Sequence, residues 1–265
     1  MRVVPEMLEA EMARVVLEER ALRRPIGKAH APDAWFIKRG ATPAVLRSAL
    51  VGLEFERARR VGKQLLLDTS NDGPTLGLHL GMSGRIIVDE AEAGDPLLYA
   101  TNRDDPAWRR FGISFADGGS LWLRDPRRLG AVELDPDESR WGPDAAVISK
   151  RQLGEIVARS TAPIKAVLMD QGRIAGLGNL LTDEVLWRVG IEPTTIASSL
   201  HDAAVTELHR TIRTTLRTLG RRGGSHTGDH MPARVPGGLC PRDGAPMLRR
   251  QVAGRTTYSC ALHQR

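Results

Sequence analysis

The chain has 265 residues and a formal net charge of +6, from 38 lysine and arginine residues against 32 aspartate and glutamate residues. A hydrophobic fraction of 41% excludes a disordered chain, and two cysteines are too few for a secreted disulfide scaffold. No apolar run approaches the roughly 18 residues of a membrane span, and the first residues lack the pattern of a signal peptide. We therefore expect a soluble, cytoplasmic protein with no membrane partner.

The positive charge is concentrated near the C-terminus. Residues 201–265 contain 11 arginines and four acidic residues, a balance of +7, so residues 1–200 hold 27 basic and 28 acidic residues, a balance of −1. Excess positive charge in one segment indicates a polyanionic partner, most simply nucleic acid. The alternative is a solvated basic surface. It accounts for the preference for arginine over lysine, but poorly for the concentration of positive charge in residues 201–265.

The first half of the chain predicts one helix followed by strands. Residues 6–20 place apolar side chains at helical spacing, with acidic residues on the opposite face. A loop rich in proline, glycine and alanine follows. Six short runs with strand character come next, separated by turn sequences such as Asp117-Gly118-Gly119. These runs are residues 63–69, 75–80, 85–88, 112–115, 120–124 and 130–134. Their lengths and spacing predict a β-sandwich or barrel.

The second half changes to a helical pattern after a polar, proline-containing linker at residues 135–147. Helices are predicted at residues 150–159, 163–170, 179–189 and 199–219. A glycine-rich, basic and irregular stretch at 220–238 then leads to a short terminal module at 240–265. The predicted organisation is a multidomain α+β chain.

The terminal module has the spacing of a metal site. Two residues separate Cys240 from Asp243, and two separate Cys260 from His263, which is the two-knuckle pattern of a structural zinc site with two of its four thiolates replaced. The alternative is a β-hairpin that keeps this shape without metal. Between the knuckles, residues 252–258 predict a strand–turn–strand that presents Arg255 at its tip.

A glycine turn precedes the third predicted helix, in the sequence Gly176-Leu177-Gly178-Asn179. Small residues let the backbone approach a phosphate, and a helix N-terminus offers free N–H donors and a positive dipole end. Asn179 suits the N-cap position. Such turns are common, so this one indicates a phosphate contact only in combination with other motifs.

Taken in order, five motifs resemble the formamidopyrimidine-DNA glycosylase / endonuclease VIII family over nearly the full length. They are PEMLEAE at 5–11, HLGMSG at 79–84, DPRRLG at 125–130, the glycine turn and the terminal module. The resemblance implies an N-terminal catalytic β-sandwich domain with one N-terminal helix at residues 1–140. It also implies a helix-two-turn-helix DNA-binding domain at 148–224 and a C-terminal zinc-finger-like hairpin at 236–265.

The resemblance also implies a DNA repair enzyme, a bifunctional DNA glycosylase and AP lyase. Such enzymes extrude an oxidised base from the duplex, because chemistry cannot reach it within the stack. By resemblance, the Pro5 amine attacks the sugar C1′ and forms an iminium, which drives β- and δ-elimination. Glu6 is the general acid/base that protonates the sugar ring oxygen. Lys63, expected on a strand, touches phosphate near the lesion.

Further residues match the family's DNA-binding positions. Met82, Arg127 and Leu129 match positions that fill the gap left by the extruded base. The family more often has Phe in place of Leu129, and a core role is the alternative for Met82. His79, Asn179 and Arg255 match phosphate-binding positions. The implied partner is double-stranded DNA with damaged bases or abasic sites, bound by a monomer in the cytoplasm at the nucleoid. Structural Zn²⁺ is the implied cofactor, held by Cys240, Asp243, Cys260 and His263.

The N-terminus departs from the family pattern. An amide-bonded proline nitrogen is no nucleophile, whereas a free α-amino group titrates near pH 8. Four residues precede Pro5. We hypothesise that translation begins at Val4, since a GTG codon can serve as a start, and that removal of the initiator methionine exposes Pro5. The alternative is an inactive family member that binds damaged or abasic DNA.

The segment before the terminal module is another departure, because only 14 residues lie between Ser225 and Cys240. Typical 8-oxoguanine glycosylases of the family carry a longer loop here that caps the flipped purine. The shorter segment favours formamidopyrimidines, oxidised pyrimidines or abasic sites over 8-oxoguanine.

Overall fold

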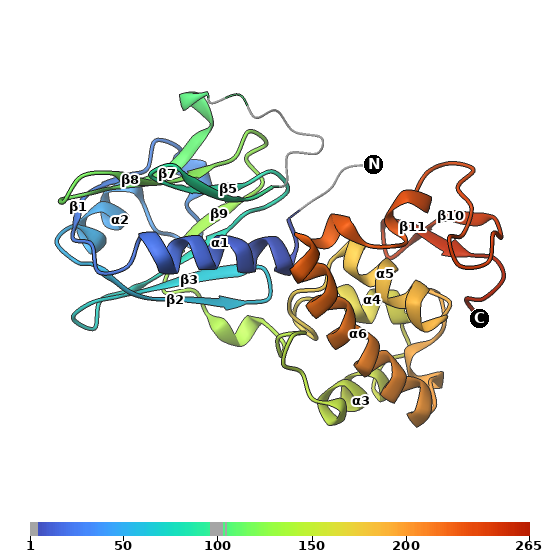
Figure 1. Cartoon of the computed structure of the whole chain (residues 1–265). Coiled ribbons are helices and arrows are strands. Elements are labelled where there is room, and N and C mark those ends of the chain that lie inside the picture. Colours follow the sequence, from blue (N-terminus) through green and yellow to red (C-terminus); the bar gives the residue numbers. More distant parts are fainter. Residues whose placement is uncertain (1–4, 96–102, 104) are drawn as a thin grey trace. The chain divides into compact units, whose positions relative to one another are not determined.

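A computed structural model describes residues 5–95, 103 and 105–265, which divide into two compact units (Figure 1). The N-terminal unit runs through Glu138, and the C-terminal unit comprises Ser139–Arg265. The predicted mixture of sheets and helices is confirmed. Within the described ranges, no helix combines the length and the apolar character needed to cross a membrane.

The N-terminal unit contains two antiparallel sheets. One has the strand order β1-β7-β8-β5-β6 and the other has the order β2-β3-β4-β9. The strands are β1 (Ile26–His30), β2 (Phe55–Val61), β3 (Gln64–Thr69), β4 (Thr75–His79), β5 (Arg85–Val88), β6 (Ala91–Gly94), β7 (Arg109–Phe115), β8 (Ser120–Arg124) and β9 (Ala131–Leu134). The helices are α1 (Met7–Arg20) and α2 (Pro43–Leu50), with 3-10 turns η1 (Ala34–Phe36) and η2 (Pro106–Trp108). Helix α1 packs against β2, β3, β5 and β6 (Figure 1).

Alternating side chains explain the core of this unit. Across the β3–β4 pair, Leu65 faces Leu78 and Leu67 faces Leu76, and all four are buried. Successive side chains on a strand point to opposite faces, so His79 lies on the other face of β4. The apolar face packs into one core that takes residues from α1, α2 and both sheets.

The prediction of a loop after the first helix is wrong, because this part of the chain contains β1, η1, α2 and β2. The charged side chains of β2 obscure the sequence pattern of a strand. Helix α2, by contrast, has a recognisable N-terminal signal: Thr42 Oγ1 accepts from Val45 N at 3.2 Å, and Pro43 occupies the first helical position. The strand placement of Lys63 is also wrong. Val61 pairs with Gln64, so Lys63 occupies the tight turn after Gly62, whose φ is 58°.

The C-terminal unit contains the remaining helices and a hairpin. Its elements are η3 (Glu138–Arg140, at the boundary), α3 (Lys150–Ala158), α4 (Ile164–Met169), α5 (Asn179–Val189), η4 (Ala197–Ser199), α6 (Asp202–Arg222), η5 (Ser225–Thr227), η6 (Met231–Ala233), β10 (Met247–Val252) and β11 (Arg255–Cys260). Helix α6 ends at Arg222, and the next residue, Gly223, has φ 102° and supplies a left-handed C-cap, a conformation that L-residues rarely adopt. It therefore extends three residues beyond the predicted end.

A buried charge cluster joins four segments of the C-terminal unit. Lys165 Nζ lies 2.6 Å from Asp183 Oδ1 and 2.7 Å from Thr257 Oγ1, while Arg234 donates to Asp183 Oδ2. Lys165, Asp183 and Arg234 are each at most 2% exposed. Buried charges are tolerated only when they are paired, so Asp183 holds together α4, α5, the segment before the hairpin, and β11.

Replacing this carboxylate tests its structural role. Asp183→Asn removes the carboxylate charge that the buried Lys165 and Arg234 share, so we expect a loss of about 3–5 kcal/mol in the free energy of unfolding, measured by urea denaturation. The control is Glu207→Gln, which removes an exposed partner of Arg210 and should cost less than about 0.5 kcal/mol. A loss for Asp183→Asn as small as the control's would contradict this role.

Candidate functional site

The start of α1 carries the first two candidate residues. Pro5 and Glu6 are buried, and Glu6 is the N-cap of the helix. A reciprocal capping box fixes it: the Glu6 side chain accepts from the Glu9 backbone, and Glu9 Oε2 accepts from Glu6 N at 2.8 Å. Residues 1–4, including the hypothesised start at Val4, lie outside the described residues. The local fold therefore places a proline and a carboxylate together at a helix N-terminus.

Arg60 connects this helix to the turn that carries Lys63. Its Nε donates to Glu11 Oε2 at 2.9 Å, and its Nη1 donates to Gly62 O at 2.7 Å. The Lys63 turn is thus tied to the first half of α1, the helix that Pro5 and Glu6 directly precede.

His79 ends β4 directly beside this turn, because it pairs with Gln64 across the β3–β4 ladder. Its Nδ1 accepts from Gly81 N at 3.1 Å. Burial and the nearby Lys63 charge lower the pKa of His79 to about 4, so the imidazole is neutral at pH 7. Since Nδ1 is an acceptor, the proton is assigned to Nε2, which makes His79 a hydrogen-bond donor for a group such as phosphate.

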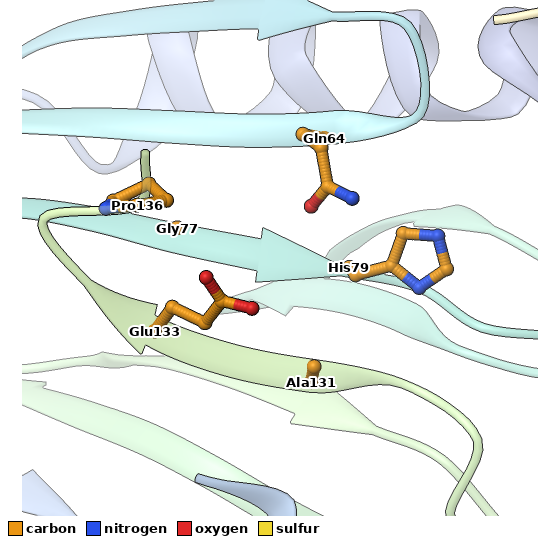
Figure 2. A pocket seen from close by; sticks show the side chains of 6 residues that line it. All are labelled: Gln64, Gly77, His79, Ala131, Glu133 and Pro136. Carbon is orange, nitrogen blue, oxygen red and sulfur yellow. The ribbon is translucent and has the colours of Figure 1, made fainter. Parts of the chain in front are cut away.

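A small hollow lies next to His79 on the outer face of this sheet. Its volume is about 190 Å³, and Figure 2 shows the Gln64, His79 and Glu133 side chains around it. Gly77, Ala131 and Pro136 complete the lining. A Cβ on Gly77 would lie 2.9 Å from Pro136 Cγ, so the close approach of Pro136 requires glycine there. The hollow keeps polar side chains within reach of a ligand on this face.

The Asp125 carboxylate organises the loop that follows β8. Its Oδ1 accepts from Arg127 N at 3.1 Å, and its Oδ2 accepts from the N–H groups of Leu129 and Gly130, each at 2.8 Å. Asp125 itself is fully buried, whereas Arg127 and Leu129 are exposed. The buried Asp125 carboxylate thus stabilises a tight loop on which the Arg127 and Leu129 side chains are exposed.

The loop carrying Met82 is packed against that loop. Ser83 Oγ donates to Asp125 Oδ1 at 2.5 Å, and a Cβ on Gly81 would lie 2.3 Å from the carbonyl carbon of Leu129. Met82 is half-buried. The structure therefore brings Met82, Arg127 and Leu129 together from two loops. Sequence reasoning missed the organising roles of Asp125 and Ser83, although an Asp before Pro is a known signal for a side chain that binds its own loop backbone.

In the C-terminal unit, Asn179 is the first residue of α5, and the expected N-cap role is wrong because Gly178 occupies that position. The Asn179 side chain turns to the hairpin instead: its Nδ2 donates to Thr256 O at 3.1 Å. Arg255 precedes Thr256, directly after the Ala253-Gly254 turn, and is exposed. The helix start and the hairpin tip are thus joined by one hydrogen bond.

The four candidate metal ligands form one cluster. One donor atom from each of Cys240, Asp243, Cys260 and His263 lies within 4.8 Å of the others. Asp243 Oδ2 is 2.5 Å from His263 Nδ1 and 3.3 Å from Cys260 Sγ, and Cys240 Sγ is 3.8 Å from His263 Nδ1. Donors at about 2.0–2.3 Å from a tetrahedral zinc ion lie about 3.3–3.8 Å apart. The two separations that involve sulfur match this spacing, whereas the Asp243–His263 contact is a direct hydrogen bond that must open by roughly 1 Å for both groups to bind zinc.

Surrounding groups orient these donors. His263 Nε2 is 3.0 Å from the Trp187 carbonyl, which turns Nδ1 to the cluster, and Trp187 Nε1 donates to Cys240 Sγ at 3.2 Å. The Ala245 N–H and His263 hold the pKa of Asp243 well below its usual range, while burial raises the pKa of the Cys260 thiol. This donor set and its supports fit a structural zinc ion.

Comparisons with known proteins agree with this geometry. The family model for the formamidopyrimidine-DNA glycosylase N-terminal domain matches residues 4–132, and the model for the formamidopyrimidine-DNA glycosylase H2TH domain matches residues 142–230. A formamidopyrimidine-DNA glycosylase from Cereibacter sphaeroides is 35% identical and one from Roseiflexus sp. is 30% identical. Both alignments cover 99% of this chain and 100% of the relative.

Solved structures of the Lactococcus lactis enzyme, Fpg (MutM), have the same fold. Its complex with DNA containing Fapy-dG aligns with a TM-score of 0.82 and 26% identity, over 98% of this chain and 100% of that one. Its complex with DNA containing an abasic site gives a TM-score of 0.81 at the same identity, over 98% and 99%.

Fold, site and comparisons define the class as the DNA glycosylases with an H2TH domain. Within that class, the chain belongs to the formamidopyrimidine-DNA glycosylase family.

Proposed function

We propose that this protein is a DNA glycosylase and AP lyase that excises oxidised bases from double-stranded DNA. The observation that carries the proposal is the composition of the N-terminal unit. It combines Pro5 and Glu6 at the start of α1 with loops that present Met82, Arg127 and Leu129. The relatives' names and the damaged DNA in the Lactococcus lactis complexes support the same activity.

The loop side chains account for base extrusion. A flipped nucleotide leaves a gap, and an unfilled gap would leave the neighbouring pairs unstacked. Leu129 is 48% exposed and apolar, and Arg127 beside it is exposed and cationic. We assign these two residues, with Met82, to the gap. Leu129 is a smaller wedge than the Phe that the family more often has.

The chemical step is assigned to Pro5 and Glu6. The lone pair of a free Pro5 nitrogen attacks C1′ of the extruded nucleotide, the bond from C1′ to the base breaks, and the departing base takes up the proton that the Pro5 nitrogen loses. Glu6 protonates the ring oxygen as the sugar opens, which leaves an iminium between Pro5 and C1′. This cation accepts the electrons released when a proton leaves C2′, so the 3′ phosphate departs by β-elimination. Loss of a second proton, from C4′, then expels the 5′ phosphate by δ-elimination.

Phosphate contacts are assigned to both units. In the N-terminal unit, Lys63 supplies a charge and His79 a neutral Nε2–H donor. In the C-terminal unit, Asn179 lies at a helix N-terminus and Arg255 at the hairpin tip. Such contacts position the protein without reading sequence. We propose that the functional domains are residues 1–140, 148–224 and 236–265. We further propose that the protein acts as a monomer on the DNA of the nucleoid, in the cytoplasm.

The segment from Ser225 to Cys240 bears on substrate choice. It is short, and Glu184 on α5 holds its middle by accepting from Asp229 N at 3.0 Å and His230 N at 2.9 Å. A segment fixed in this way is poorly suited to close over a flipped purine. We therefore propose formamidopyrimidines, oxidised pyrimidines and abasic sites as preferred substrates over 8-oxoguanine.

We further propose that Cys240, Asp243, Cys260 and His263 hold one structural Zn²⁺. Zinc would cross-link the two ends of the β10–β11 hairpin. The hairpin also meets α5 through Asn179 and Trp187, so its fixed shape would keep Arg255 in place. The metal takes no part in the chemistry.

Trapping with borohydride tests the proposed chemistry. A chain that begins at Pro5 should form a covalent adduct with abasic-site DNA, because borohydride reduces the iminium. Pro5→Gly, whose primary amine can still form an imine, should lower the yield without abolishing it. A chain that keeps residues 1–4 should form no adduct, since its proline nitrogen is an amide. Mass spectrometry of the native protein identifies the mature N-terminus. A Pro5-initiated chain that binds this DNA without forming an adduct would favour the inactive binder.

Metal analysis tests the zinc assignment. The purified protein should contain about one zinc per chain, and Cys260→Ser should lose it and lower the unfolding temperature, because ligand binding to the native state stabilises it. Asp229→Asn, an acidic residue outside the cluster, is the control and should retain the metal. Zinc below a tenth of an equivalent, with thiols that react equally fast with and without added zinc, would contradict the assignment.

A further inference from the structure

An exposed tryptophan lies beside the loop that carries Arg127 and Leu129. Trp35, in η1, is 65% exposed, whereas the other four tryptophans are buried or half-buried. Large aromatic side chains are costly to leave in water and are enriched where proteins bind partners. The activity assigned above gives Trp35 no role.

The backbone around Trp35 is fixed against β9. Ile37 forms a bridge with Val132, and Lys38 N donates to Val132 O at 2.8 Å. Phe36 is fully buried, and a Cβ on Gly130 would lie 2.7 Å from its Cζ. Phe36 therefore packs beneath the Asp125 loop, and Trp35 occupies a defined place next to it.

An ion pair fixes the same segment to the exposed side of that loop. Both Asp33 carboxylate oxygens accept from Arg128, each at 2.7 Å, and Arg110 lies 3.5 Å from the same carboxylate. The hydrogen bond to Arg128 lowers the pKa of Asp33, so the pair is charged at neutral pH. Arg128 stands between Arg127 and Leu129 in the chain, so Trp35 adjoins the residues assigned to the gap.

A lysine is held over the tryptophan. Lys38 Nζ lies 3.9 Å from the centroid of the Trp35 ring and donates to Trp35 O at 2.7 Å. Only five lysines occur in the chain, against 33 arginines. An aromatic ring with a fixed cation matches a nucleic-acid strand, which offers flat bases and sugars next to anionic phosphates.

We propose that Trp35 and Lys38 form a further DNA-binding site, in which the Trp35 ring packs on a base or sugar flanking the lesion and Lys38 pairs with a backbone phosphate. This site rests on the proposed function for its ligand, duplex DNA. It extends the contact surface of the Asp125 loop along the duplex, so it contributes to binding and takes no part in bond breaking.

The test measures affinity for a duplex with a tetrahydrofuran abasic-site analogue, by fluorescence anisotropy over a range of salt concentrations. Trp35→Ala should weaken binding roughly 5- to 100-fold, as expected for loss of one stacking contact, and leave the salt dependence unchanged. Trp35→Phe should recover most of the affinity. Lys38→Ala should reduce the slope of log K against log salt by about one, the value for one phosphate contact.

The matched control is Val51→Ala, which truncates another exposed apolar residue of the same unit and should bind as the parent does. Thermal unfolding verifies that each variant is folded. In the parent protein, DNA should also protect Trp35 from acrylamide quenching, measured as the difference from Trp35→Phe.

Several results would overturn the inference. These are affinity of Trp35→Ala within twofold of the parent, an unchanged salt slope for Lys38→Ala, or equal quenching of Trp35 with and without DNA. A dimer that Trp35→Ala dissociates, with DNA affinity unchanged, would show that the ring joins two copies instead. If the parent protein forms the borohydride adduct and Trp35→Ala binds DNA with the parent's affinity, the Trp35–Lys38 site is refuted and the proposed function stands. A parent with no adduct would defeat the proposed chemistry and leave the affinity comparison intact.

Discussion

The N-terminal unit depends on one buried carboxylate, that of Asp125. Its two oxygens accept three backbone N–H groups and one hydroxyl, which satisfies a charge with no contact to solvent. These bonds join the loop after β8 to the turn after β4. The first supplies Arg127 and Leu129, and the second supplies Met82. Without Asp125, these side chains would sit on two independent loops, and loops hold geometry poorly unless a scaffold fixes them.

The C-terminal unit has a buried carboxylate of its own, that of Asp183, which pairs with Lys165 and Arg234. Part of the positive charge of this unit therefore stabilises its fold. Several arginines are paired with acidic residues within this unit: Arg234 with buried Asp183, Arg222 with Asp229, and Arg250 with Glu192. Arg255, at the hairpin tip, remains exposed. The net charge therefore indicates the polyanionic partner, while the structure separates arginines that build the unit from those that can meet DNA.

Prediction from sequence succeeded where periodicity is strong and failed where it is weak. The strands at Arg85–Val88 and Ser120–Arg124 and the helix at Asn179–Val189 agree with the structure, because their apolar spacing is clear. Strand β2, with the sequence FERARRV, was missed because only Phe55 and Ala58 are buried and a register shift between Phe55 and Arg57 breaks the alternation of a regular strand. Asn179 was misplaced by one position, since a glycine can occupy the N-cap while Asn179 bonds to the hairpin.

The residues that we propose to contact DNA could be found by motif, whereas the residues that position them could not. Asp125, Asp183 and Asp33 act through contacts 42, 51 and 95 residues apart in the chain, to Ser83, Arg234 and Arg128. No local pattern encodes such pairs. The same holds for Trp35, whose exposure and fixed backbone appear only in three dimensions.

The most direct test of the central claim compares two single-turnover rates of Asp125→Ala, with Ser83→Ala as a milder variant that keeps the carboxylate. One rate is excision of a formamidopyrimidine from duplex DNA, and the other is strand cleavage at a preformed abasic site. If Asp125 holds the gap-filling loops, excision should slow about 100-fold, as a displacement near 1 Å can cause, while cleavage changes less than about tenfold. A folded Asp125→Ala protein that excises the lesion at the parent rate would contradict the account.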